Sequence, residues 1–141
     1  MSAEKIVLAA HGSRSPEANA SVVELARTLG ERLDAQVFAA FLEMAEPTIL
    51  EAIRMAASHQ ARRIVVVPFF LAPGMHVRRD LLRIVEQSRR ELGVPIVVAE
   101  FFGSHAQIPE LLFDITRAAL GHDGGAGGPL RGPDDLRTRQ E

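Results

Sequence analysis

The chain of 141 residues contains no cysteine, which excludes disulfide bonds, thiolate metal ligands and a cysteine nucleophile. It also has no marked excess of charge of either sign, because 16 Lys and Arg residues face 18 Asp and Glu residues. The resulting net charge of −2 offers no electrostatic basis for binding nucleic acid or a membrane surface. We therefore expect neither of these partners.

Long apolar runs are missing as well, since none approaches the ~18 residues of a membrane-spanning helix. The first residues, MSAEKIVLAA, lead directly into a predicted strand and lack the pattern of a secretory signal peptide, so we expect a cytoplasmic protein. The sequence also lacks the GxGxxG, GxxxxGK[ST] and GxSxG signatures. These absences argue against a dinucleotide-binding fold, a P-loop protein and an α/β-hydrolase.

What is present is an ordinary globular composition, with 47% hydrophobic and 24% charged residues. Apolar runs alternate with segments of helical periodicity along the chain. Strands are predicted at 5–10, 36–42, 63–70 and 95–101, and helices at 16–33, 47–58, 77–92 and 106–120. This order predicts an α/β fold, a three-layer αβα sandwich with a four-stranded parallel sheet. We expect one domain over 1–120 and a disordered, Gly- and Pro-rich tail over 121–141.

Two histidines follow predicted strands that lie far apart in the sequence. His11 comes directly after the first strand, and His76 comes shortly after the third. Because the carboxyl ends of parallel strands lie along one edge of an open sheet, both imidazoles are expected in one crevice. Neutral imidazole is a good ligand for Fe²⁺, Co²⁺ and Ni²⁺, and histidine titrates near the working pH. The pair predicts a site that handles a divalent metal ion transiently.

Other polar residues are expected at the same edge of the sheet. Glu43 follows the second strand and could be a third metal ligand or could orient a histidine. Arg14 and Arg78 could receive carboxylates of a ligand, and the N-terminus of the third helix would favour such anions. His105 follows the fourth strand and could support the site or bind substrate, whereas the Ser13 hydroxyl is expected to cap the next helix.

Each of these residues also has a purely structural interpretation. His11 and His76 could cap helix N-termini or donate to loop carbonyls, and Glu43 could be a solvated loop carboxylate. Arg78 could belong to a solvated helix face, and His105 could be an ordinary residue at a helix start. The residues alone leave both interpretations open.

Several segments resemble a known family, the small CbiX-type sirohydrochlorin chelatases among the class II tetrapyrrole chelatases. The matching segments occur in the order and spacing of that family and span nearly all of residues 5–120. They are AAHGSR at 9–14, FLEMAEPTILEAI at 41–53, VVPFFLAPGMHVRRD at 66–80 and FFGSHAQIPELL at 101–112. The resemblance implies a chelatase-like, flavodoxin-like lobe.

The resemblance also implies an activity and the residues that perform it. The activity is that of a lyase that inserts Co²⁺ or Fe²⁺ into sirohydrochlorin with release of two protons, the metal being a substrate and no cofactor being tightly bound. His11 and His76 match the active-site histidines; we hypothesise that His11 contacts the ion and accepts a proton while His76 completes the metal contact. Glu43, the candidate third metal ligand from its place after the second strand, belongs with Ala45 to a lip over 43–46 that faces the macrocycle. The residues that would border the macrocycle are Leu71, Ala72, Pro73, Gly74, Met75 and His76.

The length of the chain corresponds to the short form of the family, which implies a homodimer. Ni²⁺ is a weaker candidate, because the chain lacks the histidine-rich insertion of short nickel-inserting relatives. One alternative is a carrier that binds metal or tetrapyrrole without transforming it. A histidine phosphatase ranks far lower, because those enzymes have arginine before the strand-end histidine and this chain has Ala10. A half-enzyme that pairs with a different polypeptide is the remaining alternative.

Overall fold

The computed structural model describes residues 3–121, which include nine helices and strands. The chain divides into two compact units, Met1–His105 and Ala106–Glu141, and each is described by itself. The first unit contains β1 (Glu4–Ala10), α1 (Pro16–Leu33), β2 (Gln36–Phe41), α2 (Ile49–Ser58), β3 (Arg63–Pro68), α3 (Met75–Leu92), β4 (Ile96–Val98) and the 3₁₀ turn η1 (Phe102–Ser104). The second contains α4 (Ile108–Leu120).

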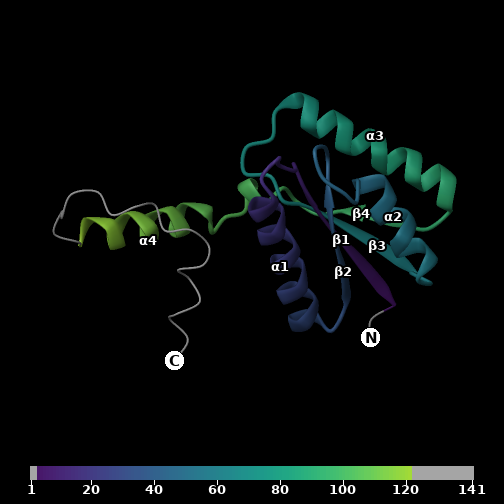
Figure 1. The fold of residues 1–141 in the computed structure, drawn as a ribbon, viewed down its shortest axis with the longest axis horizontal. Coiled ribbons are helices and arrows are strands. Elements are labelled where there is room, and N and C mark those ends of the chain that lie inside the picture. The colour runs from purple at the N-terminus through teal and green to yellow at the C-terminus, as the bar shows by residue number, and fades with distance from the viewer. Residues whose placement is uncertain (1–2, 122–141) are drawn as a thin grey trace. The chain divides into compact units, whose positions relative to one another are not determined.

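The first unit is a parallel sheet between helices, which confirms the predicted α/β class. The strand order is β2-β1-β3-β4 and every pair of neighbours is parallel. Helices α2 and α3 lie on one face of this sheet and α1 lies on the other (Figure 1). In this order the chain reverses direction across the sheet between β1 and β3, which is where open α/β sheets bind ligands.

The strands are buried on both faces, as their apolar sequences predict. Val7 and Ala9 of β1 belong to the larger core cluster, which also contains Ile53 of α2 and Leu81 of α3. Leu8, between them in sequence, points to the other face and belongs to the cluster under α1. Alternate residues of β1 therefore anchor helices on opposite faces, which fixes the register of this central strand.

The register brings the ends of the central strands to the same level. Ala10 is opposite Phe41, and Ala9 is opposite both Ala40 and Pro68. The Phe69 amide, just past β3, still donates to the Ala9 carbonyl over 2.7 Å. The residues that follow β1, β2 and β3 consequently leave the sheet side by side, as the sequence predicts.

The third helix begins earlier than predicted. It starts at Met75 rather than at 77, after Gly74 adopts the extended conformation of an N-cap (φ −69°, ψ 170°). His76 therefore lies in the first turn of α3 instead of in the loop before it. Helical spacing consequently applies from His76 onward, and this changes which side chains share its face.

Other element ends differ from the predicted ones by one to three residues. β3 ends at Pro68, where the missing N–H stops the strand as expected. β4 covers only Ile96–Val98, because the chain turns into η1 instead of extending the strand to 101. Thr48 caps α2 in a capping box with Glu51, so α2 begins at 49 rather than at 47.

The second unit contains the predicted closing helix, α4, which begins at 108 rather than at 106. Its apolar residues Ile108, Leu111, Leu112 and Ile115 recur at helical spacing. The expectation of one domain over 1–120 stays a prediction. The tail expected over 121–141 lies, apart from Gly121, outside the described residues. Within residues 3–121, every helix is too short or too polar to cross a lipid bilayer.

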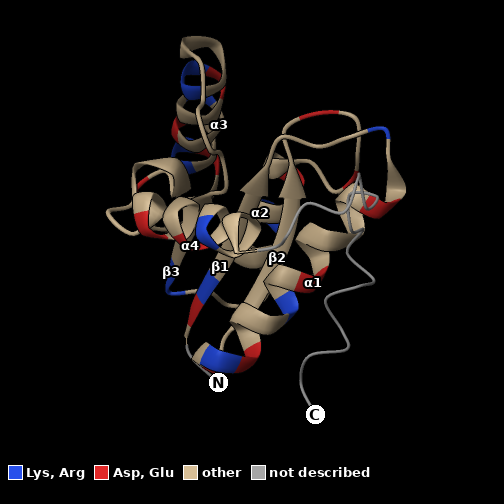
Figure 2. Ribbon diagram, turned by 90° about the vertical axis from the view of Figure 1, so that its left-hand side faces the viewer, with Lys and Arg blue, Asp and Glu red and all other residues tan. Residues whose placement is uncertain are grey.

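Charged residues follow one another along the outer side of α3 (Figure 2). One of them, Glu91, links α3 to α2, because Arg54 donates from Nε and Nη2 to its two carboxylate oxygens over 2.8 and 3.0 Å. These hydrogen bonds hold the pKa of Glu91 below its ordinary value.

We expect Glu91→Gln to lower the melting temperature at neutral pH. A carboxyl group whose pKa is depressed on folding stabilises the protein above its unfolded pKa, and this stabilisation disappears as the pH falls through the folded pKa. The difference in melting temperature between wild type and Glu91→Gln should therefore shrink on acidification below about pH 4. Thermal unfolding followed by circular dichroism at several pH values measures it. Glu86→Gln, which removes an ion pair within α3 only, is the control; an equal pH dependence of both variants would contradict the assignment.

Candidate functional site

The site begins with a close approach between the loops that follow β1 and β2. Leu42 donates to the Ala10 carbonyl over 2.9 Å, and Glu43 donates to the His11 carbonyl over 3.0 Å. Gly12 makes room for this contact, since a Cβ built on it would lie 1.8 Å from the Glu43 carbonyl oxygen. Its φ of +93° is also strained for any other residue. The two loops therefore meet through their backbones.

This backbone contact brings two functional side chains together. His11 Nε2 lies 3.3 Å from Glu43 Oε1, and both side chains are about half exposed (49% and 56%). The other ring nitrogen, Nδ1, lies 3.2 Å from the Gly12 carbonyl oxygen. A carbonyl oxygen only accepts hydrogen bonds, so Nδ1 is the donor in this contact. In the neutral tautomer with its proton on Nδ1, the His11 ring presents the Nε2 lone pair to the Glu43 carboxylate.

Two electron-pair donors that face each other require a cation between them. The cation can be a proton on Nε2, which Glu43 then accepts as a hydrogen bond. It can also be a metal ion, because two ligands each about 2.1 Å from one ion lie roughly 3.0 to 3.4 Å apart. The observed 3.3 Å fits this range. The pair can thus hold a proton or a divalent ion and exchange one for the other.

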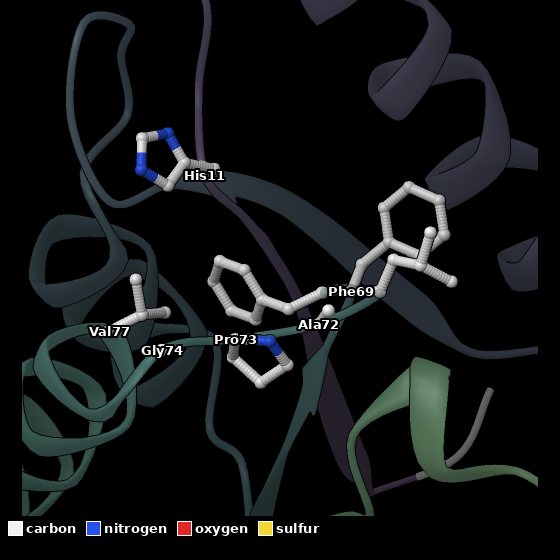
Figure 3. A pocket seen from close by; sticks show the side chains of 8 residues that line it. His11, Phe69, Ala72, Pro73, Gly74 and Val77 are labelled. Carbon is white, nitrogen blue, oxygen red and sulfur yellow. The ribbon is translucent and has the colours of Figure 1, made fainter.

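An apolar cavity of about 220 Å³ opens on one side of His11. Figure 3 shows the His11 ring on one wall, with Pro73 and Gly74 on the opposite wall. The remaining wall residues come from the segment after β3 and the start of α3. They are Phe69, Phe70, Leu71, Ala72 and Val77. We call this the apolar cavity.

The loop that forms the apolar cavity is held by the turn after β4. Gly103 donates to the Phe70 carbonyl over 3.0 Å, and a Cβ on Gly103 would lie 1.5 Å from the Leu71 carbonyl oxygen. Arg78 stacks over the Phe101 ring, 4.6 Å from its centroid. Gly103 and Phe101 were not predicted to support the site, although a glycine at a strand end signals this kind of close backbone contact.

A second cavity, of about 320 Å³, opens where the β1 and β2 loops face α3. We call it the polar cavity, and His11 and Val77 also belong to the apolar cavity. Its residues are His11, Leu42, Glu43, His76, Val77, Asp80, Arg83 and Ile84. Both predicted active-site histidines and Glu43 therefore line one cavity. In this conformation, no three His, Asp or Glu side chains among residues 3–121 gather closely enough to hold a metal ion.

Asp80 and Arg83 also line the polar cavity, and neither was predicted from the sequence as a site residue. Asp80 follows His76 by four residues, so the two side chains share one face of α3. The four-residue spacing of His76 and Asp80 could have predicted that Asp80 belongs to the site. It did not do so, because the predicted helix began at 77 and therefore excluded His76.

Ser13 and Arg14 lie beside the cavities without lining either one. The Ser13 amide donates to Asn19 Oδ1 over 3.0 Å, and its hydroxyl accepts from the Ser15 amide over 3.0 Å. The predicted capping role of Ser13 is therefore wrong: Ser13 stabilises the turn into α1, and Ser15 is the N-cap. Arg14 is exposed in the same turn.

Of the remaining predicted residues, Ala45, Met75, Arg78 and His105 also lie outside the walls of both cavities. Ala45 packs against the core cluster under α1. Met75 is 75% exposed at the start of α3. His105 Nε2 lies 3.9 Å from Glu100 Oε1. The structure therefore brings together the His11, Glu43 and His76 group and the 71–74 loop, but not these four residues.

Comparisons with known proteins identify the family. The CbiX family model matches residues 5–119. The chain belongs to the CbiX family. It is 31% identical over 140 residues to a sirohydrochlorin cobaltochelatase of Methanopyrus kandleri, with 84% of this chain and 98% of that protein covered. It is 30% identical over 122 residues to the chloroplastic sirohydrochlorin ferrochelatase of Arabidopsis thaliana, covering 85% of this chain but only 54% of that protein.

A solved structure supports the same assignment. The CbiX protein of cobalamin (vitamin B12) biosynthesis from Marinobacter aquaeolei VT8 superposes with a TM-score of 0.74 at 30% identity, covering 83% of this chain and 97% of that one. The resemblance stated from the sequence segments is thereby confirmed. The CbiX-family chain also has the predicted parallel α/β architecture.

We expect Gly12→Ala to weaken binding of Co²⁺ to the CbiX-family chain, because the added Cβ pushes the Glu43 backbone away from His11. Gly93→Ala is a matched control, since Gly93 also has a positive φ (+62°) but a Cβ added to it would meet nothing within 4 Å. Both variants should lose roughly 1–2 kcal/mol of unfolding free energy from the strained φ. Only Gly12→Ala should also lose affinity in calorimetric Co²⁺ titrations; equal affinities of the two variants would contradict this role.

Proposed function

We propose that this protein is a sirohydrochlorin chelatase that inserts a divalent metal ion into the metal-free tetrapyrrole and releases two protons. The proposal is carried by the position of His11, which lines both the apolar and the polar cavity and faces Glu43 in the polar one. His76 lines the polar cavity together with this pair. The names of the Methanopyrus and Arabidopsis relatives support the same activity.

Co²⁺ or Fe²⁺ is the proposed metal substrate. Imidazole nitrogen and carboxylate oxygen bind both ions, and such ligands discriminate little between them. The relatives are named for cobalt in one case and for iron in the other. Ni²⁺ ranks lower, because the sequence contains no histidine-rich stretch.

The apolar cavity is the proposed seat of the macrocycle edge. Its wall residues from Leu71 to Gly74 offer a largely apolar surface against which a flat conjugated ring can pack. The ring would be flanked by Met75 and by the lip over 43–46, which contains Glu43 and Ala45. Ser13, Arg14 and His105 lie in the loops around this edge, and Arg78 lies in the first turns of α3. The cationic groups there could receive carboxylates of the substrate.

The His11–Glu43 pair carries the proposed cation exchange. With the ion between Nε2 and the carboxylate, and His76 completing the contact, the metal is held by few protein ligands and remains free to leave. As the metal passes into the macrocycle, a pyrrole proton takes its place between Nε2 and Glu43. Both side chains are half exposed, so protons pass from the pair to water. One divalent ion enters the ring and two protons leave it, which balances the charge.

We propose that the protein acts as a cytoplasmic homodimer, with neither a nucleic-acid nor a membrane partner. The apolar cavity of about 220 Å³ is smaller than the ~300–1,000 Å³ of ordinary ligand pockets, so a second wall is needed to enclose a tetrapyrrole. A second copy of the chain can supply that wall. The Arabidopsis relative, of which this chain spans 54%, has room for a second such lobe in one polypeptide.

Substitution of the histidines tests the proposed function. We expect His11→Ala and His76→Ala each to reduce the rate of Co²⁺ insertion by about 100-fold or more, because each removes a metal contact and His11 also accepts a proton. The change of the visible absorption spectrum of sirohydrochlorin on metal insertion measures the rate. His59→Ala is the control, since His59 ends α2 and its Nδ1 donates to the Met55 carbonyl away from both cavities.

A metal-free spectrum that stays unchanged with wild-type protein and Co²⁺ or Fe²⁺, despite binding of both substrates, would contradict insertion. That outcome would instead identify the carrier. Wild-type rates in both histidine variants would overturn the assignment of the site.

The oligomeric state is tested separately. Light scattering coupled to size exclusion should give twice the chain mass of 15.4 kDa, at least when sirohydrochlorin is bound. A fully active particle with the mass of one chain would contradict the homodimer.

A further inference from the structure

Asp80 and Arg83 give the polar cavity a charge arrangement that the proposed function does not use. Arg83 Nη2 donates to Asp80 Oδ1 over 3.1 Å, and both residues line the cavity with His11, Glu43 and His76. The Asp80 carboxylate is therefore the second acidic group on the walls of the cavity that also holds the His11–Glu43 pair. Unlike Glu43, it is neutralised by a cation of its own helix.

The position of Asp80 suits it to handle the same ion as His76. The two residues are four positions apart on α3, so their side chains rise from adjacent turns on one face. Together they offer one imidazole and one carboxylate, the same ligand types that His11 and Glu43 present from the strand-end loops. Carboxylate oxygen and imidazole nitrogen are both suitable for divalent first-row metals.

The hydrogen bond that occupies Asp80 is easily exchanged. The Arg83 side chain is 71% exposed and that of Asp80 is 42% exposed. An exposed pair of this kind within one helix adds little stability, because water screens it and two side chains must be ordered to form it. A carboxylate of a bound ligand can therefore replace Asp80 as the partner of Arg83, and the planar guanidinium accommodates a new carboxylate with two hydrogen bonds.

We propose that Asp80 is a further metal-binding residue and that Arg83 makes its availability depend on the anionic tetrapyrrole. Without substrate, Arg83 neutralises Asp80, and Glu43 beside His11 is the carboxylate among the walls of the polar cavity that remains available to a metal ion. When a carboxylate of the tetrapyrrole binds Arg83, Asp80 is released, and two carboxylates then match the charge of a divalent ion. Metal is thus held most tightly once the acceptor ring is present. The role of the tetrapyrrole in this inference rests on the proposed chelatase function. The binding of metal by Asp80 does not.

The same arrangement assists release of the product. After the metal has entered the macrocycle, the pair at His11 and Glu43 holds a proton instead of a divalent ion. Asp80 then loses its cation and can accept the Arg83 guanidinium again. Return of Arg83 to Asp80 weakens the hold on the carboxylate of the product, because that carboxylate then shares the guanidinium with Asp80.

The first experiment is a calorimetric titration of Co²⁺ into the full chain without tetrapyrrole. We expect Arg83→Gln to tighten Co²⁺ binding about tenfold, because it frees Asp80, and we expect this gain to vanish in the Asp80→Asn, Arg83→Gln double variant. Arg90→Gln and Glu86→Gln on α3 are charge-matched controls, since neither residue lines the polar cavity. Circular dichroism spectra and melting curves show whether every variant is folded.

The second experiment measures insertion kinetics with the same variants. Asp80→Asn should raise KM for Co²⁺ about tenfold while kcat changes less than about twofold, because Asp80 contributes to binding of the ion and not to its transfer into the macrocycle. Arg83→Gln should raise KM for sirohydrochlorin and not KM for Co²⁺. If the Asp80–Arg83 ion pair were purely structural, both substitutions would change the two KM values in the same direction.

Three results would overturn the proposal. The first is that Arg83→Gln binds Co²⁺ with the same affinity as Arg90→Gln. The second is that the tighter Co²⁺ binding persists in the double variant. The third is that Asp80→Asn has the same KM for Co²⁺ as Glu86→Gln. Failure of the chelatase function is distinguishable, because it would appear as absence of insertion by the wild type. The titrations without tetrapyrrole would still decide whether Arg83 controls the access of metal to Asp80.

Discussion

The hydrogen bond from the Glu43 amide to the His11 carbonyl, 3.0 Å long, continues the β1–β2 ladder beyond the last residues of both strands. It exists because the register of the sheet ends β1 and β2 at the same level and because Gly12 leaves space for the Glu43 backbone. The His11 ring is in turn held by the Gly12 carbonyl, which directs Nε2 to the Glu43 carboxylate. The chemistry of the site is therefore set by backbone geometry before any metal binds.

His11 belongs to two cavities of opposite character, and this explains how one residue can serve two substrates. The apolar cavity beside the 71–74 loop suits the flat ring, whereas the polar cavity beside α3 suits a hydrated ion. The ring and the ion can approach the same nitrogen from different sides. A site with few ligands and half-exposed side chains holds an ion weakly enough to transfer it, unlike a closed structural metal site.

The sequence predicted the parallel sheet and the shared edge for His11, Glu43 and His76, because buried strands and parallel strand ends follow simple rules. It did not predict that α3 begins at Met75, since Gly74 acts as N-cap through its backbone conformation without any side-chain signal. For that reason Asp80 escaped notice, although it shares a helix face with His76. The role of Gly103 was also not predicted, because its contact with the Leu71 backbone joins segments far apart in the sequence and produces no periodic pattern of residues.

The proposed function requires that His11 and His76, which both line the polar cavity, contact the same divalent ion. X-ray absorption at the cobalt edge of the Co²⁺-loaded protein tests this claim directly, because multiple scattering from imidazole rings reports how many histidines bind the metal. We expect two imidazole ligands in the wild type and one in each of the His11→Ala and His76→Ala proteins. A spectrum without imidazole scattering, or one that neither substitution changes, would contradict the claim.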